Sequence, residues 1–173
     1  MEGITVIAET DRLILRRYRE SDLQDLYEYL SNPEVVKFEP YRPMSMDEVR
    51  HNLEWRISTD EMTAVELKES HKMIGNVYLG NRDFESLEIG YVFNQDYWGK
   101  GYAKESCKAL LEYHSSKGVK CFTAGTGLNN IPSVQLLKSL GFTLVGTEKV
   151  SFYKDEQGKD IYFDGGIYEL SFE

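Results

Sequence analysis

Apolar residues recur three or four positions apart in four stretches of the chain, a spacing typical of helices that bury one face. Two of these stretches open with a capping box, Ser21-x-x-Gln24 and Ser45-x-x-Glu48, whose side chains would bind the unpaired N–H groups of a helix start. The predicted helices cover about residues 21–30, 45–57, 103–114 and 132–140.

Elsewhere the apolar positions follow the period of two that is typical of a half-buried strand. In residues 87–93 this alternation puts Leu87, Ile89, Tyr91 and Phe93 on one face. Strands are also predicted at residues 12–17, 63–68, 73–79 and 120–126, and a strand-rich end from residue 142 has a hairpin turn at 155–158. A meander that feeds a strand–helix–strand unit and a closing hairpin predicts an α/β (mixed α+β) fold, with a mixed, mostly antiparallel sheet flanked by helices.

Length, composition and charge narrow the class of protein. A chain of 173 residues with 41% apolar residues fits one domain with a real core, so we expect residues 1–173 to form a single domain. The N-terminus has no basic segment followed by an apolar one, and no stretch approaches the roughly eighteen apolar residues of a membrane helix, so we expect a cytoplasmic protein with no membrane partner. The net charge of −9 argues against nucleic acid and weakly favours a cationic partner. Neither Cys107 nor Cys121 lies in a ligand-like cluster, and the three histidines are scattered, so no metal site is expected.

The segment between the strand at 87–93 and the next helix holds two glycines, Gly99 and Gly101. Unpaired amides and the helix dipole at a helix start both favour a bound phosphate. The segment lacks the lysine and hydroxyl pattern of a Walker A loop, and Lys104 stands where a dinucleotide-binding fingerprint needs a third glycine. The residues alone therefore leave two readings open, an anion-binding turn and an ordinary tight turn.

Four short motifs occur in an order and spacing that resemble the GNAT acetyltransferase superfamily, and more narrowly its RimJ/RimL-like branch. They are Glu88-Ile-Gly-Tyr91, Tyr97-Trp-Gly-Lys-Gly-Tyr-Ala103, Asn130-x-x-Ser133 and Leu140-Gly-Phe142. The opening Thr10-Asp-Arg-Leu-Ile-Leu-Arg16 and the later Ser21-Asp22 are similar to that branch as well. The resemblance implies a GNAT-like fold and an acetyl-CoA-dependent transfer of an acetyl group to a primary amine, by direct attack on the thioester. The acceptor would be either a small-molecule amine or a protein N-terminus, and dimers are common in the family, so a homodimer is an option.

The resemblance also assigns roles in binding acetyl-CoA. Tyr91, Val92 and Phe93 would offer backbone groups to the pantetheine arm and the thioester carbonyl. Asn130 and Ser133 would contact the pantetheine further along. The pyrophosphate would be held by the main-chain amides of Gly99, Lys100, Gly101, Tyr102 and Ala103. One departure is that Asp96 stands where the superfamily has Gln or Arg, with Gln95 one residue too early.

Acetyl transfer to an amine needs a base and a donor to the departing thiolate. Glu88 matches the strand glutamate that some GNAT enzymes use as base, and its alternative role is ordinary pairing across the sheet. Glu66 and His71 are further candidates by position alone. Leu137 occupies the place of the tyrosine acid found in many GNAT enzymes, so we expect Ser133 to replace it, with capping of the helix start as its alternative role. The missing tyrosine leaves a second function open, a non-catalytic acyl-CoA-binding module.

Overall fold

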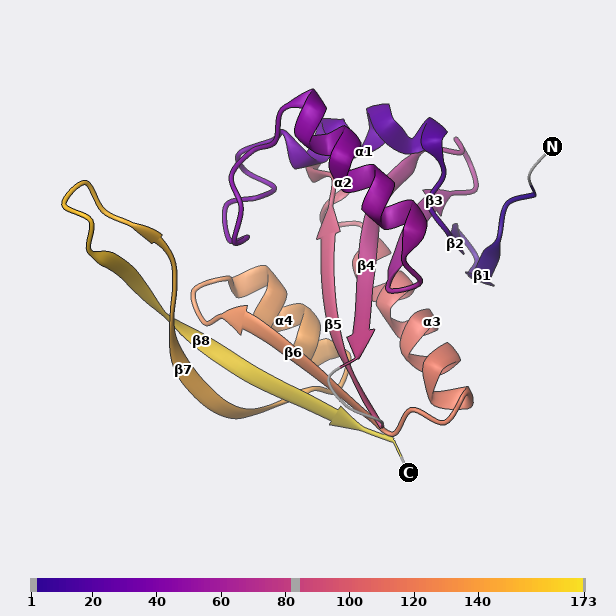
Figure 1. Ribbon diagram of the computed structural model, residues 1–173. Helices are drawn as coiled ribbons and strands as arrows, with labels where there is room; N and C mark the ends of the chain where they lie inside the picture. The colour runs from indigo at the N-terminus through magenta and orange to yellow at the C-terminus, as the bar shows by residue number, and fades with distance from the viewer. Residues whose placement is uncertain (1–2, 82–84, 173) are drawn as a thin grey trace.

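The computed structural model describes residues 3–81 and 85–172, which form one eight-stranded sheet and four α-helices (Figure 1). The strands are β1 (Val6–Glu9), β2 (Leu13–Arg16), β3 (Met62–Leu67), β4 (Met73–Asn81), β5 (Ser86–Phe93), β6 (Cys121–Gly127), β7 (Thr143–Lys154) and β8 (Asp160–Ser171). The helices are α1 (Leu23–Leu30), α2 (Met46–Ser58), α3 (Tyr102–Ser116) and α4 (Ile131–Ser139), with 3-10 turns at Glu20–Asp22 and Gln95–Tyr97.

The strand order across the sheet is β1-β2-β3-β4-β5-β6-β8-β7. Every neighbouring pair is antiparallel except β5 and β6, which run parallel and are connected through α3. The predicted meander, strand–helix–strand unit and closing hairpin are therefore confirmed. Strand β1 was not predicted, because its four residues have no fully buried position to set an alternating pattern.

Helices cover both faces of the sheet (Figure 1), and an apolar core lies on each face. On one face, α3 and α4 pack against the side of β5 that carries Leu87, Ile89 and Phe93. On the other face, α1 and α2 cover a second core, against which Val92 packs. The predicted alternation along β5 is thus confirmed, and it assigns successive β5 side chains to opposite sides of the sheet.

The two predicted capping boxes have different outcomes. At α2, Ser45 Oγ accepts from the Glu48 N–H at 3.2 Å and the Glu48 carboxylate accepts from the Ser45 N–H at 3.1 Å, which confirms the box. At α1 the prediction is wrong, because Ser21 lies inside the preceding 3-10 turn and Asp22 is the residue that precedes the helix. The Asp22 carboxylate instead accepts from the Arg19 N–H at 2.9 Å.

A buried cluster of charges joins the start of the chain to the centre of the sheet. The Arg16 guanidinium donates to both carboxylate oxygens of Asp22, at 2.8 and 2.9 Å, and to Glu66 Oε1 at 2.8 Å. All three side chains are at most 3% exposed. Arg19 contacts the same two carboxylates from outside, with a side chain that is 39% exposed. We call Arg16, Asp22 and Glu66 the buried ion cluster.

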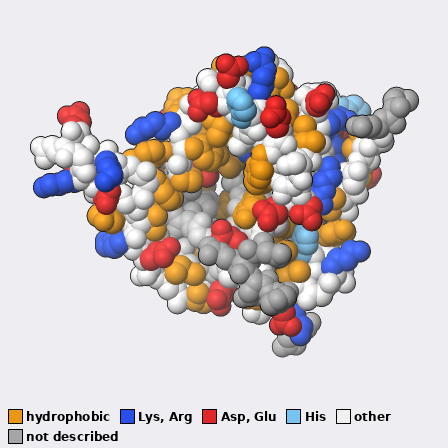
Figure 2. Space-filling view, viewed as in Figure 1, with side chains coloured by type: hydrophobic (Ala, Val, Ile, Leu, Met, Phe, Trp, Pro, Cys, Tyr) orange, Lys and Arg blue, Asp and Glu red, His pale blue; other side chains and the backbone are white. Residues whose placement is uncertain are grey.

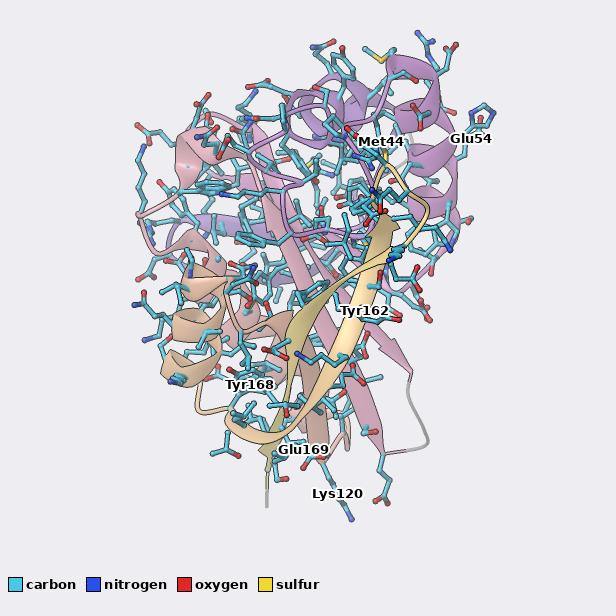
Figure 3. All side chains as sticks on the ribbon, turned by 90° about the vertical axis from the view of Figure 1, so that its left-hand side faces the viewer. Met44, Glu54, Lys120, Tyr162, Tyr168 and Glu169 are labelled. Atoms are coloured by element: carbon cyan, nitrogen blue, oxygen red, sulfur yellow. The ribbon has the colours of Figure 1, made fainter. Side chains whose placement is uncertain are left out.

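Strands β7 and β8 form a hairpin of twelve residues a side that extends beyond the rest of the sheet (Figures 1 and 3). The predicted turn is confirmed, since the Asp155 N–H donates to the Lys159 carbonyl at 2.8 Å and the Gly158 N–H to that of Asp155 at 3.0 Å. Tyr153 Oη donates to the Glu39 carbonyl at 3.3 Å, so the hairpin also contacts the segment between α1 and α2. The surface between hairpin and body is hollowed (Figure 2). In residues 3–81 and 85–172, no helix combines the length and apolar character that crossing a bilayer requires.

Candidate active site

Strands β5 and β6 pair only at their beginnings and then part. Their parallel pairing covers Ser86 to Glu88 on β5 and ends at the pair Glu88 and Thr123. Beyond this point the two strands diverge (Figure 1). Among the described residues no strand pairs with this side of β5 from Ile89 to Phe93, so its backbone edge faces a gap in the sheet.

Hydrogen-bond alternation decides which backbone groups reach this edge. The Asn94 N–H donates to the Ile74 carbonyl at 2.8 Å, and in an antiparallel pair every second residue bonds to the same neighbour. Val92 therefore directs its N–H and carbonyl toward β4, whereas Tyr91 and Phe93 direct theirs toward the gap. The Phe93 carbonyl already accepts from Trp98 Nε1 at 2.8 Å.

The glycine segment makes a left-handed turn directly before α3. Gly99 has φ +74° and Gly101 has φ +83°, conformations that side chains with a Cβ rarely adopt. Gly101 is the N-cap of α3, and the first N–H groups of a helix have no partner within it. The turn thus presents unpaired amides at a helix start, as an anion site requires.

Arg12 anchors this turn from the other end of the chain, a contact that sequence reasoning missed. Its guanidinium donates to the Lys100 carbonyl at 3.0 Å and pairs with Glu105 in the first turn of α3 at 2.8 Å. Thr10 Oγ1 donates to the same carboxylate at 2.6 Å. Burial disfavours the charged form of Glu105, but the bonds from Thr10 and Arg12 outweigh it and lower its pKa. The Thr10 to Arg16 motif was the sequence feature that could have indicated this contact. In the structure two of its residues, Thr10 and Arg12, hold Glu105 and the Lys100 carbonyl.

Ser133 and Asn130 lie at the start of α4, across the gap from β5. Asn130 Oδ1 accepts from the Ser133 N–H at 3.4 Å, so Asn130 caps the helix and Ser133 does not. Ser133 Oγ lies 2.7 Å from Tyr91 Oη, which reaches it from β5. Leu137 is buried one turn further along the helix.

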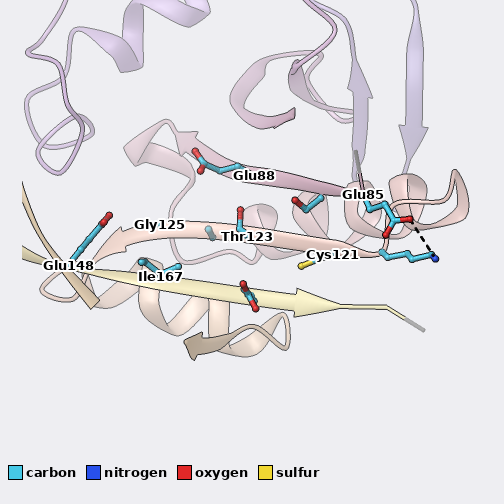
Figure 4. Close-up of a pocket in the computed structure, with 11 residues that line it drawn as sticks. Glu85, Glu88, Cys121, Thr123, Gly125, Glu148 and Ile167 are labelled. Atoms are coloured by element: carbon cyan, nitrogen blue, oxygen red, sulfur yellow. Dashed lines mark ion pairs between the residues drawn. The ribbon is translucent and has the colours of Figure 1, made fainter. Parts of the chain in front are cut away.

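Glu88 lies at the point where β5 and β6 part, on the opposite face of the sheet from α3 and α4. It lines an open pocket of about 560 Å³ to which β5, β6, β7 and β8 all contribute residues (Figure 4). Lys120 is the one cation among the described lining residues, 3.9 Å from Glu85. The pocket includes four carboxylates, those of Glu85, Glu88, Glu148 and Glu169.

The other two candidate bases belong to a different part of the molecule. Glu66 is held in the buried ion cluster, and His71 Nδ1 lies 3.2 Å from its carboxylate. Both come from β3 or the turn after it, and β4 separates β3 from β5. The structure therefore does not bring Glu66 or His71 to the parting of the strands.

Glu39, on the segment between α1 and α2, is a further acidic residue that the sequence did not single out. Its side chain is half-buried, and burial raises its pKa to about 7. No motif surrounds Glu39, so only the folded chain reveals its environment. Within the described part of the chain, no cluster of three His, Cys, Asp or Glu side chains has the arrangement of a metal site.

Comparison with known proteins identifies the family. A family model described as an acetyltransferase (GNAT) domain matches residues 12–143, and the chain belongs to this family. Among curated proteins it is 30% identical over 160 residues to the uncharacterized N-acetyltransferase YnaD of Bacillus subtilis, a match that covers 89% of this chain and 92% of YnaD. The chain is thus an N-acetyltransferase of the GNAT family, which confirms the resemblance to the superfamily.

Two solved structures share the whole fold. RimL, a ribosomal L7/L12 alpha-N-protein acetyltransferase in complex with coenzyme A, has a TM-score of 0.81 at 21% identity, covering 96% of this chain and 97% of RimL. Spermidine N-acetyltransferase from Vibrio cholerae, in complex with CoA and spermine, has a TM-score of 0.78 at 21% identity, covering 94% of this chain and 96% of the other. At these identities the likeness concerns the fold.

Proposed function

We propose that the protein transfers an acetyl group from acetyl-CoA to a primary amine by direct attack on the thioester. The observation that carries this proposal is the parting of β5 from β6 at Glu88. It exposes a backbone edge beside the glycine turn, and it opens an acidic pocket on the other face of the sheet. A thioester and an amine approaching from these two sides would meet at the gap.

The residues around the gap fit acetyl-CoA, which supplies the activated acyl group. The backbone groups of Tyr91 and Phe93 face the gap and can bond to an amide-containing arm such as pantetheine. The amides of the turn from Gly99 to Ala103 suit a pyrophosphate. Asn130 and Ser133 lie across the gap at the start of α4. Val92 contributes packing in this proposal, because its backbone is directed toward β4.

Glu88 is the proposed base. An alkylamine is mostly protonated at pH 7, and the neutral form is the nucleophile, so a nearby carboxylate or a bridging water must accept a proton. The nitrogen then forms a bond to the carbonyl carbon and loses its second proton to water, the carbon–sulfur bond breaks, and the electron pair of that bond moves to sulfur. The Phe93 N–H can stabilise the negative charge on the carbonyl oxygen, and one such donor is typically worth about 3 kcal/mol.

The pocket favours a cationic acceptor. Its four carboxylates come from Glu85, directly before β5, and from β5, β7 and β8, and they outnumber the cation Lys120, so the approach to Glu88 carries net negative charge (Figure 4). A polyamine and a protein N-terminus are both cationic when protonated, and the names of the two structural relatives mention spermidine and an alpha-N-protein acceptor.

The test is thiol release from acetyl-CoA across a panel of polyamines, aminoglycosides, amino acids and short N-terminal peptides. We expect turnover with one cationic class, and a fall of at least about 100-fold in kcat for Glu88→Gln. Glu69→Gln is the control, since Glu69 lies in the exposed β3–β4 turn outside the pocket. Full activity of Glu88→Gln would exclude Glu88 as base and direct the search to Glu39. Tight binding of acetyl-CoA with no turnover of any amine would favour the non-catalytic acyl-CoA-binding module.

A further inference from the structure

One hydrogen bond crosses the gap between β5 and α4. Tyr91 Oη lies 2.7 Å from Ser133 Oγ and 3.3 Å from the Ser133 carbonyl. The Tyr91 side chain lies on the face of β5 that packs against α3 and α4, and Ser133 lies in the first turn of α4. The contact therefore joins the two walls between which the thioester would lie.

Either hydroxyl can be the donor in this short contact, so the geometry allows the phenol to donate to Ser133 Oγ. Burial raises the pKa of Tyr91, against the opposing effect of its hydrogen bond with Ser133, so the phenol keeps its proton at neutral pH. A protonated phenol can donate to Ser133 Oγ, and Ser133 then retains its own O–H for another acceptor. The Ser133 hydroxyl is not used to cap the helix, because Asn130 caps α4.

We propose that Tyr91 is a positioning residue, whose hydroxyl donates to Ser133 Oγ and so directs the Ser133 O–H toward the leaving sulfur. This inference rests on the proposed function. As the carbon–sulfur bond breaks and its electron pair moves to sulfur, the Ser133 O–H donates a hydrogen bond to the developing thiolate. The thiolate then leaves and takes its proton from water, so neither Tyr91 nor Ser133 changes its protonation state.

This arrangement accounts for the leucine at position 137. A buried Leu137 cannot donate to sulfur from α4. Tyr91 brings a phenol to the same helix from the strand, one turn earlier, and acts through Ser133. In this proposal, stabilising the leaving sulfur, which a single tyrosine on the helix would otherwise do, is divided between Tyr91 and Ser133.

The test is a double-mutant cycle with Tyr91→Phe and Ser133→Ala. We expect each single variant to lower kcat about tenfold, the loss typical of one hydrogen bond to a developing charge. The double variant should be no slower than Ser133→Ala, because Tyr91 acts only through Ser133. The Kd for acetyl-CoA, measured by calorimetry, should stay within about twofold in Tyr91→Phe.

A second readout separates this role from a structural one. An acetyl thioester of an aromatic thiol needs less stabilisation of its departing sulfur, so Tyr91→Phe should lose less activity with it than with acetyl-CoA. Tyr168→Phe is the matched control, since the Tyr168 hydroxyl is buried and finds no hydrogen-bond partner among the described residues. It should retain full kcat.

Three results would overturn the positioning role while leaving the proposed function intact. They are full kcat in Tyr91→Phe, losses that multiply to about 100-fold in the double variant, and a deficit that does not depend on the leaving group. A wild-type protein that binds acetyl-CoA and acetylates no amine would overturn the proposed function and this inference together.

Discussion

Replacing Arg16 by methionine tests how much the burial of an arginine adds to the stability that its contacts with Asp22 and Glu66 provide. Methionine has a similar length and no charge, so the change leaves Asp22 and Glu66, each 3% exposed, without their main partner. Removing one member of a buried ion pair typically costs about 3–5 kcal/mol, because an uncompensated charge stays in a medium of low polarity. For a chain of this length the loss corresponds to a fall in Tm of about 6–20 °C.

Arg19→Met is the matched comparison. Arg19 also contacts Asp22 and Glu66, at 4.0 and 3.2 Å, yet its side chain is 39% exposed. Both variants remove one positive charge and introduce the same side chain beside the same two carboxylates. Because water screens an exposed pair, we expect Arg19→Met to cost no more than about 1 kcal/mol.

The assay is reversible urea and thermal unfolding of the three proteins, followed by circular dichroism. The expected order of stability is wild type, then Arg19→Met a little below it, then Arg16→Met far below. Equal losses in the two variants would refute the reasoning, because the Arg16 guanidinium is buried and donates three hydrogen bonds to the two carboxylates, whereas that of Arg19 is partly exposed and donates one. A loss below about 1 kcal/mol in Arg16→Met would show that water or local rearrangement compensates the two carboxylates.

Three further predictions concern the site and its surroundings. Gly99→Ala should weaken acetyl-CoA binding about 5–30-fold by calorimetry, since φ is +74° at this position and the left-handed conformation costs a residue with a Cβ about 1–2 kcal/mol. Gly99→Asn should lose less affinity, because asparagine adopts this conformation more readily, and equal losses would contradict the conformational cause. Arg12→Gln should raise the KM for acetyl-CoA about three- to tenfold with little change in kcat, because the change removes the bonds to the Lys100 carbonyl and Glu105. An unchanged KM would show that the glycine turn keeps its shape without Arg12. Glu39 has a folded pKa of about 7, above its ordinary 4.5, so it lowers stability as pH rises between these values. Glu39→Gln should therefore be about 1–2 kcal/mol more stable than wild type at pH 8 and little different at pH 4, allowing for solvent screening. A gain independent of pH in thermal unfolding would exclude this titration.

The sequence predicted most of the fold because its signals are local. Period-two alternation identified β5 and the faces of its side chains, and the box at Ser45 located the start of α2. The box at Ser21 failed because Asp22, three residues after Arg19, makes a stronger set of bonds there than serine can. A pattern read within a few residues cannot include a partner such as Glu66, fifty residues from Arg16.

The candidate site shows the same limit more strongly. The glycine turn and the motifs around it could be recognised from the sequence, and the roles of Glu88 and Ser133 remain predictions. The contact of Arg12 with Lys100 spans 88 residues, and that of Tyr91 with Ser133 spans 42. Such pairs depend on which strands become neighbours, so they can be found only once the sheet is assembled.

The parting of β5 from β6 also has a consequence for the order of binding. The glycine turn leads into α3 on one face of the sheet, whereas the acidic pocket opens on the other, so neither ligand need block the entry of its partner. Kinetics should then follow a ternary-complex scheme, with initial-rate plots whose lines intersect, rather than a ping-pong scheme. A bisubstrate inhibitor would have to pass between the two strands, with coenzyme A on one side and a cationic amine joined to its sulfur on the other. Because the two halves are joined covalently through the gap, such a conjugate should bind more tightly than either coenzyme A or the amine alone.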